Sequence, residues 1–210
     1  MANFQSIHST RTGFGFWLQW VCVTVLGFLI SLYWIEIGFK PDIGLMQGAI
    51  GGTVVGVAQT IVLRQRLPRS WEWAFATIVG WCFVDLLHVG VMGWVAPRTD
   101  ATMGRLYYGM LDGVQVGLIV GAAQWLAIRR SLSQAWRWIL GTGTAWAVGL
   151  SCGWIVGGIL RLKTHLFLGE VVGLAFGWMM MGVLSGIVLV NLLNSTELEE
   201  LEPSRSRPFK

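Results

Sequence analysis

The chain has 210 residues, of which 54% are apolar and only 12% are charged, and its net charge at pH 7 is +4. Soluble domains carry about 25% charged residues, so this composition excludes a water-soluble globular domain and a disordered chain. The basic residues form no dense tract and the three cysteines form no C-x-x-C motif; nothing favours nucleic-acid binding or a disulfide scaffold.

Six apolar stretches are each long enough for a helix that crosses a bilayer, which needs about 20 residues. Helices are expected because backbone polar groups in lipid must be bonded within their own segment. The sequence therefore predicts an all-α, polytopic membrane bundle over residues 1–194. Its hairpins are expected at about 16–63, 73–128 and 138–193, and residues 195–210 as a polar cytoplasmic tail. The six stretches are 16–38, 43–63, 73–95, 106–128, 138–160 and 169–193.

The distribution of positive charge predicts an orientation. With six spans, ten Lys and Arg residues fall on the side of both termini, and five, including Arg105, on the other side. Cytoplasmic loops carry an excess of Lys and Arg, so both termini are expected to be cytoplasmic. Arg64 and Arg129, in the loops after the second and fourth stretches, are expected to reach lipid phosphate as interface anchors.

The chain contains an internal repeat. A shift of 65 residues aligns 52–86 with 117–151 without a gap, and 11 of the 35 positions are identical. The shared pattern is G-x3-G-x2-Q-x4-R-x6-W-x-W-x3-T-x3-W. It covers one predicted helix, the basic loop and the start of the next helix. Repeats of this length indicate a duplicated supersecondary unit, and two-helix units are expected to be parallel repeats related by an axis along the membrane normal.

A third copy of this unit is suggested by weaker matches. Trp20 is followed eight residues later by Phe28, as Trp73 is by Trp81. In the last apolar stretch, Gly182 and Ser185 stand where the other copies have glycine and glutamine. The bundle is therefore predicted to contain two or three related hairpins.

The repeated glycines and glutamines share helix faces. Small residues let helices approach closely in lipid, so the glycines are predicted to serve helix packing. Gln59 and Gln124 continue these faces, where a glutamine can bond a neighbouring helix; the alternative is that they bind a ligand or line a pore. The predicted packing glycines are Gly52, Gly56, Gly113, Gly117 and Gly121.

Four repeated tryptophans flank the basic loops. Trp71 and Trp73 follow the first loop, and Trp136 and Trp138 follow the second. Tryptophan is enriched at membrane–water interfaces, so all four are predicted to be interface anchors.

The two copies read GVAQTIVLRQRLPRSWEWAFATIVGW and GAAQWLAIRRSLSQAWRWILGTGTAW. This doubled motif resembles a group of Trp- and Gly-rich multi-pass membrane proteins of unknown function that are common in cyanobacteria. The resemblance covers about half of the chain. It implies a photosynthetic bacterium and a plasma or thylakoid membrane, and it supplies no catalytic residue and no ligand.

Ionisable residues inside the apolar stretches are the candidate functional residues, because charge in the bilayer is costly. Asp85 and His88 are placed near the middle of 73–95, three residues apart and on one helix face. Asp112 and Glu170 lie near the starts of the fourth and sixth stretches.

Three functions are considered for this chain. The first is a non-catalytic structural, pigment-binding or lipid-binding subunit, or an assembly partner, of a membrane complex. Its cofactor is unknown, with chlorophyll or carotenoid as the candidates, because glycine grooves accept flat rings. The alternative is a small proton- or cation-coupled transporter or channel that uses Asp85, His88, Asp112 and Glu170. An enzyme is not expected, because no catalytic or metal-binding motif is present. The expected partners are the lipid bilayer and other membrane subunits.

Overall fold

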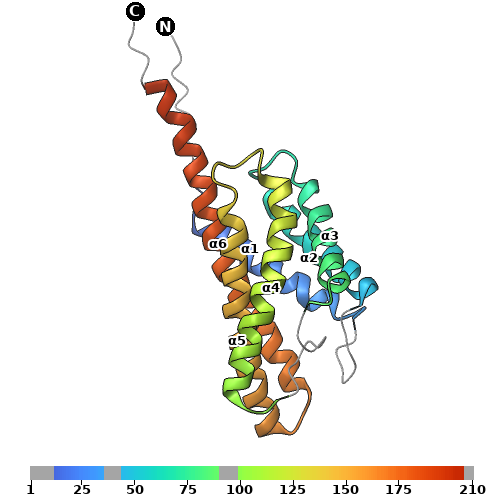
Figure 1. The fold of residues 1–210 in the computed structure, drawn as a ribbon. Helices are drawn as coiled ribbons and strands as arrows, with labels where there is room; N and C mark the ends of the chain where they lie inside the picture. Colours follow the sequence, from blue (N-terminus) through green and yellow to red (C-terminus); the bar gives the residue numbers. More distant parts are fainter. Residues whose placement is uncertain (1–11, 36–43, 90–98, 206–210) are drawn as a thin grey trace, which may run out of the picture.

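A computed structural model describes residues 12–35, 44–89 and 99–205, with side chains to residue 199. The described residues form six α-helices and no strand, as Figure 1 shows. Three of the expected stretches, 43–63, 106–128 and 138–160, match their helices within about four residues at each end, whereas the first helix already ends at Ser31 instead of at the expected bound of 38. The helices are α1 (Phe14–Ser31), α2 (Leu45–Leu63), α3 (Trp71–Leu86), α4 (Thr102–Ile128), α5 (Arg137–Thr164) and α6 (Leu168–Arg205).

The third and sixth helices differ from the predicted bounds. α3 ends at Leu86, whereas the apolar stretch was expected to continue to residue 95, and residues 90–98 lie outside the described residues. α6 continues to Arg205, so residues 195–205 extend this helix instead of starting a separate tail. The last residues of the expected tail, 206–210, lie outside the described part of the chain.

Five of the described helices are long and apolar enough to cross a membrane: α1, α2, α4, α5 and α6 as far as Glu199. α3 has 16 residues, which at about 1.5 Å per residue span about 24 Å, less than the bilayer core of about 30 Å. The chain is thus an all-α, multi-pass membrane protein by the length and composition of its helices.

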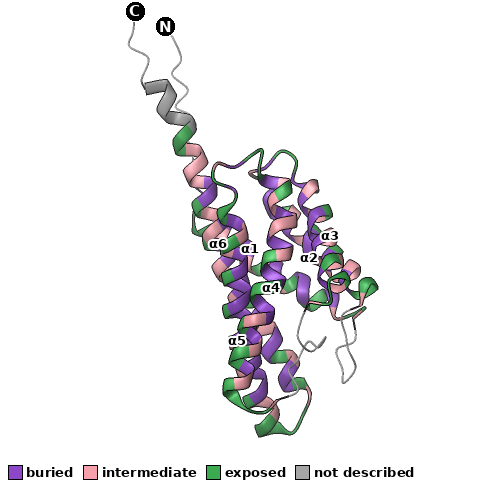
Figure 2. Cartoon of the chain, viewed as in Figure 1, coloured by how far each residue is buried: buried purple, intermediate pink, exposed green. Residues whose placement is uncertain are grey.

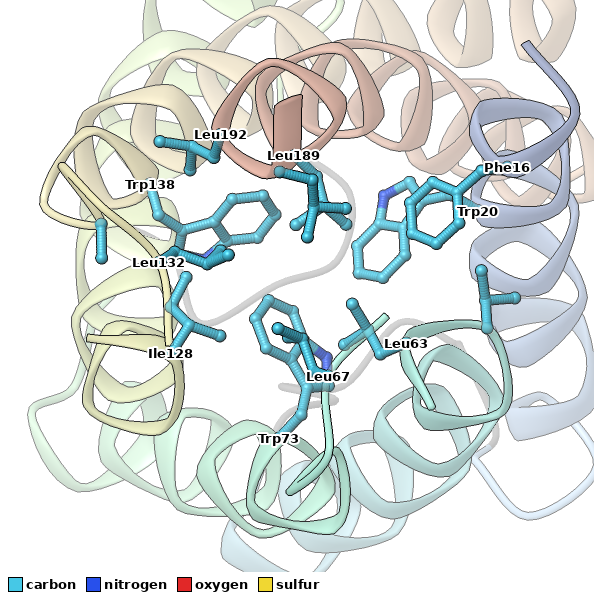
Figure 3. Close-up of a cluster of buried hydrophobic side chains, with 13 residues drawn as sticks. Phe16, Trp20, Leu63, Leu67, Trp73, Ile128, Leu132, Trp138, Leu189 and Leu192 are labelled. Carbon is cyan, nitrogen blue, oxygen red and sulfur yellow. The ribbon is translucent and has the colours of Figure 1, made fainter. Parts of the chain in front are cut away.

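The helices form a closed ring. Each packs against its neighbours in the chain, and α6 also packs against α1. Figure 3 views this ring with the side chains of one buried cluster inside it. The α2–α3 and α4–α5 loops lie at one end, together with the C-terminal half of α6, and the α5–α6 loop lies at the other (Figure 1).

Burial follows the ring. Buried residues lie on the faces that the helices turn toward one another, and exposed residues lie on the outside (Figure 2). The outer face carries large apolar side chains such as Leu26, Phe75 and Leu140. The outside of the ring is thus largely apolar, whereas the buried aromatic and polar groups lie inside it.

Candidate functional site

The first copy of the repeat places a buried glutamine between two neighbouring helices. Gln59 of α2 accepts a hydrogen bond from the indole Nε1 of Trp73 on α3, at 2.9 Å. Its amide Nε2 donates to Thr24 Oγ1 on α1, at 3.1 Å. All three residues are buried. One side chain therefore ties three consecutive helices together and satisfies the indole N–H, which needs a partner when buried.

The second copy makes the same two bonds. Gln124 of α4 accepts from Trp138 Nε1 on α5 at 3.1 Å, and its Nε2 donates to Thr77 Oγ1 on α3 at 3.0 Å. Gln59 and Trp73 align with Gln124 and Trp138 in the sequence repeat, and in each copy the threonine acceptor, Thr24 or Thr77, belongs to the preceding helix. The repeated Gln and Trp are thus a hydrogen-bonding pair.

A related contact joins α6 to α1. Trp20 Nε1 donates to Ser185 Oγ at 3.1 Å, and Thr24 follows Trp20 by four residues, as Thr77 follows Trp73. Tryptophans of α1, α3 and α5 are therefore each bonded to a polar residue of an adjacent even-numbered helix.

Three tryptophans meet inside the ring (Figure 3). Trp20, Trp73 and Trp138 are each 1% exposed. Their ring centroids lie 5.2–6.2 Å apart, and all three pairs are edge-on. Such pairs contribute about 0.5–1.5 kcal/mol each beyond their buried area.

This burial corrects half of the predicted aromatic belt. Trp73 and Trp138 are core residues, whereas Trp71 and Trp136 are exposed. Residues two apart on a helix point in nearly opposite directions, because each residue turns the helix by about 100°; only one of each pair can face outward. Arg64 and Arg129 are exposed and cap the C-termini of α2 and α4.

The repeated glycines of α2 bring α3 close. A Cβ added at Gly52 would lie 2.9 Å from Ile78 Cα, and one at Gly56 would lie 3.1 Å from Ala74 Cα. Both neighbours are backbone atoms, so these positions admit no side chain without separating the helices.

The glycines of α4 face α5 in the same way. Added Cβ atoms at Gly113 and Gly117 would lie 2.4 Å and 2.6 Å from the carbonyl oxygens of Trp146 and Thr142. At Gly121 the nearest atom is Thr142 Cβ, at 3.1 Å. The backbone of α5 therefore fills the glycine groove, and the expectation that this groove accepts a flat ring is wrong for the face described here.

Asp85 and His88 do not form the mid-helix pair that was expected. Asp85 lies in the last turn of α3 and is half-buried, whereas His88 follows the helix, is exposed and has a left-handed backbone (φ 50°). The His88 backbone N–H donates to the Asp85 carbonyl oxygen at 2.8 Å. This turn breaks the helical spacing, and within the described residues no hydrogen bond or ion pair joins the two side chains.

Glu170 belongs to a buried ion-pair cluster. Arg105 grips its carboxylate with two bonds, Nη1 to Oε2 at 2.9 Å and Nη2 to Oε1 at 2.7 Å. The Arg105 guanidinium also donates to the carbonyl oxygens of Thr99 and Trp154, both at 2.8 Å. Arg161 Nε lies 2.9 Å from Glu170 Oε1, and Arg161 also pairs with Asp100.

This cluster was missed in the sequence, where Arg105 was assigned to a loop. Arg105 is 1% exposed on α4. Gly157 and Gly158 of α5 make room for it, because added Cβ atoms would lie 2.8 Å from Glu170 Oε2 and 2.6 Å from Arg105 Nε. In the sequence, this cluster could have been suspected from the glycine pair Gly157–Gly158 together with Glu170, a glutamate in an apolar stretch. The hydrogen bonds and ion pairs of this cluster join α4, α5 and α6 at one end of the bundle.

The remaining acidic candidate, Asp112, is buried on α4. Across the described residues, no group of three His, Cys, Asp or Glu side chains is placed to hold a metal ion. Comparisons of the chain with protein-family models, curated proteins and solved structures find no match.

Proposed function

We propose that this protein is a non-catalytic, structural membrane protein that serves as a subunit or assembly partner of a membrane complex. The observation that carries this proposal is the filled interior of the ring. Trp20, Trp73 and Trp138 meet there edge to edge, and each indole N–H is bonded to a buried partner. A closed and internally bonded bundle suits a rigid scaffold.

The transporter alternative has less support from the geometry. A proton path needs a series of titratable groups, each close to the next, across the membrane. Glu170 is held by Arg105 and Arg161 at the end of the bundle near the α5–α6 loop. Asp85 and His88 lie at the end of α3 and are separated by a turn. Asp112, the remaining acid of the expected path, is buried on α4.

Lipid is the partner that the outer surface fits best. Large apolar side chains cover the outside of every described helix, including the short α3 with Phe75 and Phe83. We propose that all six helices lie in the bilayer and that both termini are cytoplasmic, in a bacterial plasma or thylakoid membrane. A pigment would have to bind on this outer surface, since α5 fills the α4 groove.

We propose further that the ring is built from a repeated two-helix unit. The equivalent Gln–Trp bonds pair α2 with α3 and α4 with α5. The Ser185–Trp20 bond pairs α6 with α1 in the same sense. This unit is a helix that bears glutamine, or Ser185 in α6, followed by a helix that bears tryptophan. It is shifted by one helix from the hairpins expected at 16–63, 73–128 and 138–193, and α6 with α1 is its divergent third copy.

The C-terminal extension of α6 gives this scaffold a contact element. The helix has 38 residues, about 57 Å at 1.5 Å per residue, and Figure 1 shows it projecting beyond the neighbouring loops. Thr196 is hydrogen-bonded to Ser133, and Glu197 pairs with Arg66, so both basic loops hold the base of the extension. Glutamates at 199, 200 and 202 make it acidic.

The proposal is tested by purifying the tagged full chain from its native membrane in a mild detergent. We expect it to migrate as part of a larger assembly and to show no visible absorbance of its own when isolated. A variant that ends at Glu199 should keep its melting temperature and leave the assembly. A full chain that migrates alone in every mild detergent would refute the assembly role.

A further inference from the structure

The polar bonding inside the ring is incomplete at one position. Gln59 and Gln124 each accept from a tryptophan and donate to a threonine of the preceding helix. On α6 the same place is taken by Ser185, which accepts from Trp20. The serine side chain is too short to make both bonds of a glutamine. A glutamine at position 185 would by analogy donate to Thr142 of the preceding helix, α5.

Because Ser185 stands in place of a glutamine, Thr142 lacks the hydrogen bond that the amide would donate. Its side chain is 2% exposed, and its Oγ1 has no hydrogen-bond partner among the described residues. The hydroxyl of Ser185 has only weak acceptors, Gly182 O at 3.4 Å and Met181 Sδ at 3.6 Å. Buried hydroxyls without good partners are costly, so both groups call for a further polar partner.

Thr142 and Ser185 line the same cavity. Its polar lining consists of Gln59, Thr77, Gln124, Thr142 and Ser185, and the rest of its lining is tryptophan and apolar side chains. Every lining residue except Trp81 is buried. About 20 Å³ of it is open to the centre of a water molecule, and one water needs about 10–15 Å³ measured in this way.

We propose that this cavity is a binding site for a single buried water molecule that replaces the missing glutamine amide. The water bonds Thr142 Oγ1 and Ser185 Oγ. Gln124 Oε1 can add a third bond, because its carbonyl oxygen has two lone pairs and accepts from Trp138 with one of them. Two to four polar partners are what a buried water needs. The cavity is too small for an organic ligand, and no charged side chain lines it to hold an ion.

The direct test is an experimental structure of the full chain at a resolution that reveals ordered water. The expected result is one isolated density peak within hydrogen-bond distance of Thr142 Oγ1 and Ser185 Oγ. An empty site in a map that resolves other buried waters would overturn the proposal. An elongated density would also overturn it, because that shape belongs to an organic molecule.

Two matched variants exchange the water for the amide. Ser185→Gln should abolish the peak and raise the melting temperature by a few degrees, because the new amide bonds both Trp20 and Thr142. Gln124→Ser makes the reverse change in the second copy, and it should lower the melting temperature and create a new peak beside Thr77. A peak that persists in Ser185→Gln would contradict the assignment.

Thr142→Val keeps the test independent of how the larger substitutions pack. Valine has nearly the same shape but no hydroxyl. If water is bound, the substitution removes one of its partners and lowers the melting temperature. If the cavity is dry, the substitution removes a buried hydroxyl that has no partner, so the melting temperature should rise, and that outcome would refute the water site.

Discussion

Gly117→Ala measures how closely α4 and α5 must approach. The added Cβ would lie 2.6 Å from the Thr142 carbonyl oxygen and 2.7 Å from Gly143 Cα, whereas ordinary contact begins at 3.4 Å. The helices must therefore move apart by about 0.8 Å, the difference between 3.4 and 2.6 Å, or distort locally. Both neighbours are backbone atoms, so no flexible side chain can yield.

Gly15→Ala is the matched control for this substitution. Gly15 lies in the first turn of α1, and a Cβ there would meet nothing within 4 Å. Both variants gain the higher helix propensity of alanine, so the difference between them isolates the packing cost. Overpacking costs about 1–3 kcal/mol, and in a chain of this size 1 kcal/mol shifts the melting temperature by about 2–4 °C.

The assay is thermal unfolding of both variants in one detergent. We expect Gly117→Ala to melt about 2–12 °C below Gly15→Ala, and Gly15→Ala to melt at or slightly above the parent temperature. Equal melting temperatures for the two variants would refute the inference that the glycines of α4 are required for contact with α5.

Three further predictions follow from the buried polar groups and the topology. Gln124→Leu leaves the buried Trp138 Nε1 without its acceptor and removes the bond to Thr77 Oγ1, so the free energy of unfolding should fall by about 1–3 kcal/mol; unchanged unfolding in detergent would contradict the bonded role of this glutamine. Glu170→Gln leaves the buried Arg105 charge with only the exposed Asp100 carboxylate, 3.9 Å away, as counter-charge, and it should destabilise the chain by about 3–5 kcal/mol. Adding Arg105→Met should recover much of the loss; a double variant no more stable than Glu170→Gln would refute this pairing. Single cysteines at the exposed positions Gln65 and Ser131, with the three native cysteines replaced, should resist impermeant thiol reagents in intact cells; labelling of both from outside would reverse the proposed orientation.

The helical architecture could be predicted because hydropathy and length depend on local sequence. Each of the six apolar stretches contains a helix, and α2, α4 and α5 lie close to the expected bounds. The end of α3 was not foreseen, since the stretch after Leu86 remains apolar and hydropathy does not distinguish a helix from a turn there. Asp85 and His88 were therefore placed on one helix face, although His88 lies beyond the helix and itself has a left-handed backbone.

The interior could be predicted only in part. The repeat identified Gln59 and Trp73 as important together, but not that they bond each other, because a tryptophan suits the membrane interface as well as a buried hydrogen bond. Helical periodicity would have separated Trp71 from Trp73, since they lie on opposite faces. The Arg105–Glu170 pair joins residues 65 positions apart on different helices, and such a pairing depends on how α4 and α6 come together.

We propose that this bundle is a closed scaffold and not a conduit, and a measurement of ion flux distinguishes the two. The purified parent protein is reconstituted into liposomes under an imposed pH gradient and a membrane potential, with protein-free liposomes as the reference. We expect the same proton and cation flux in both preparations, because, among the described residues, the buried tryptophan rings leave only a water-sized cavity inside the ring. A protein-dependent flux that is lost in Asp112→Asn would contradict this proposal and favour the transport function.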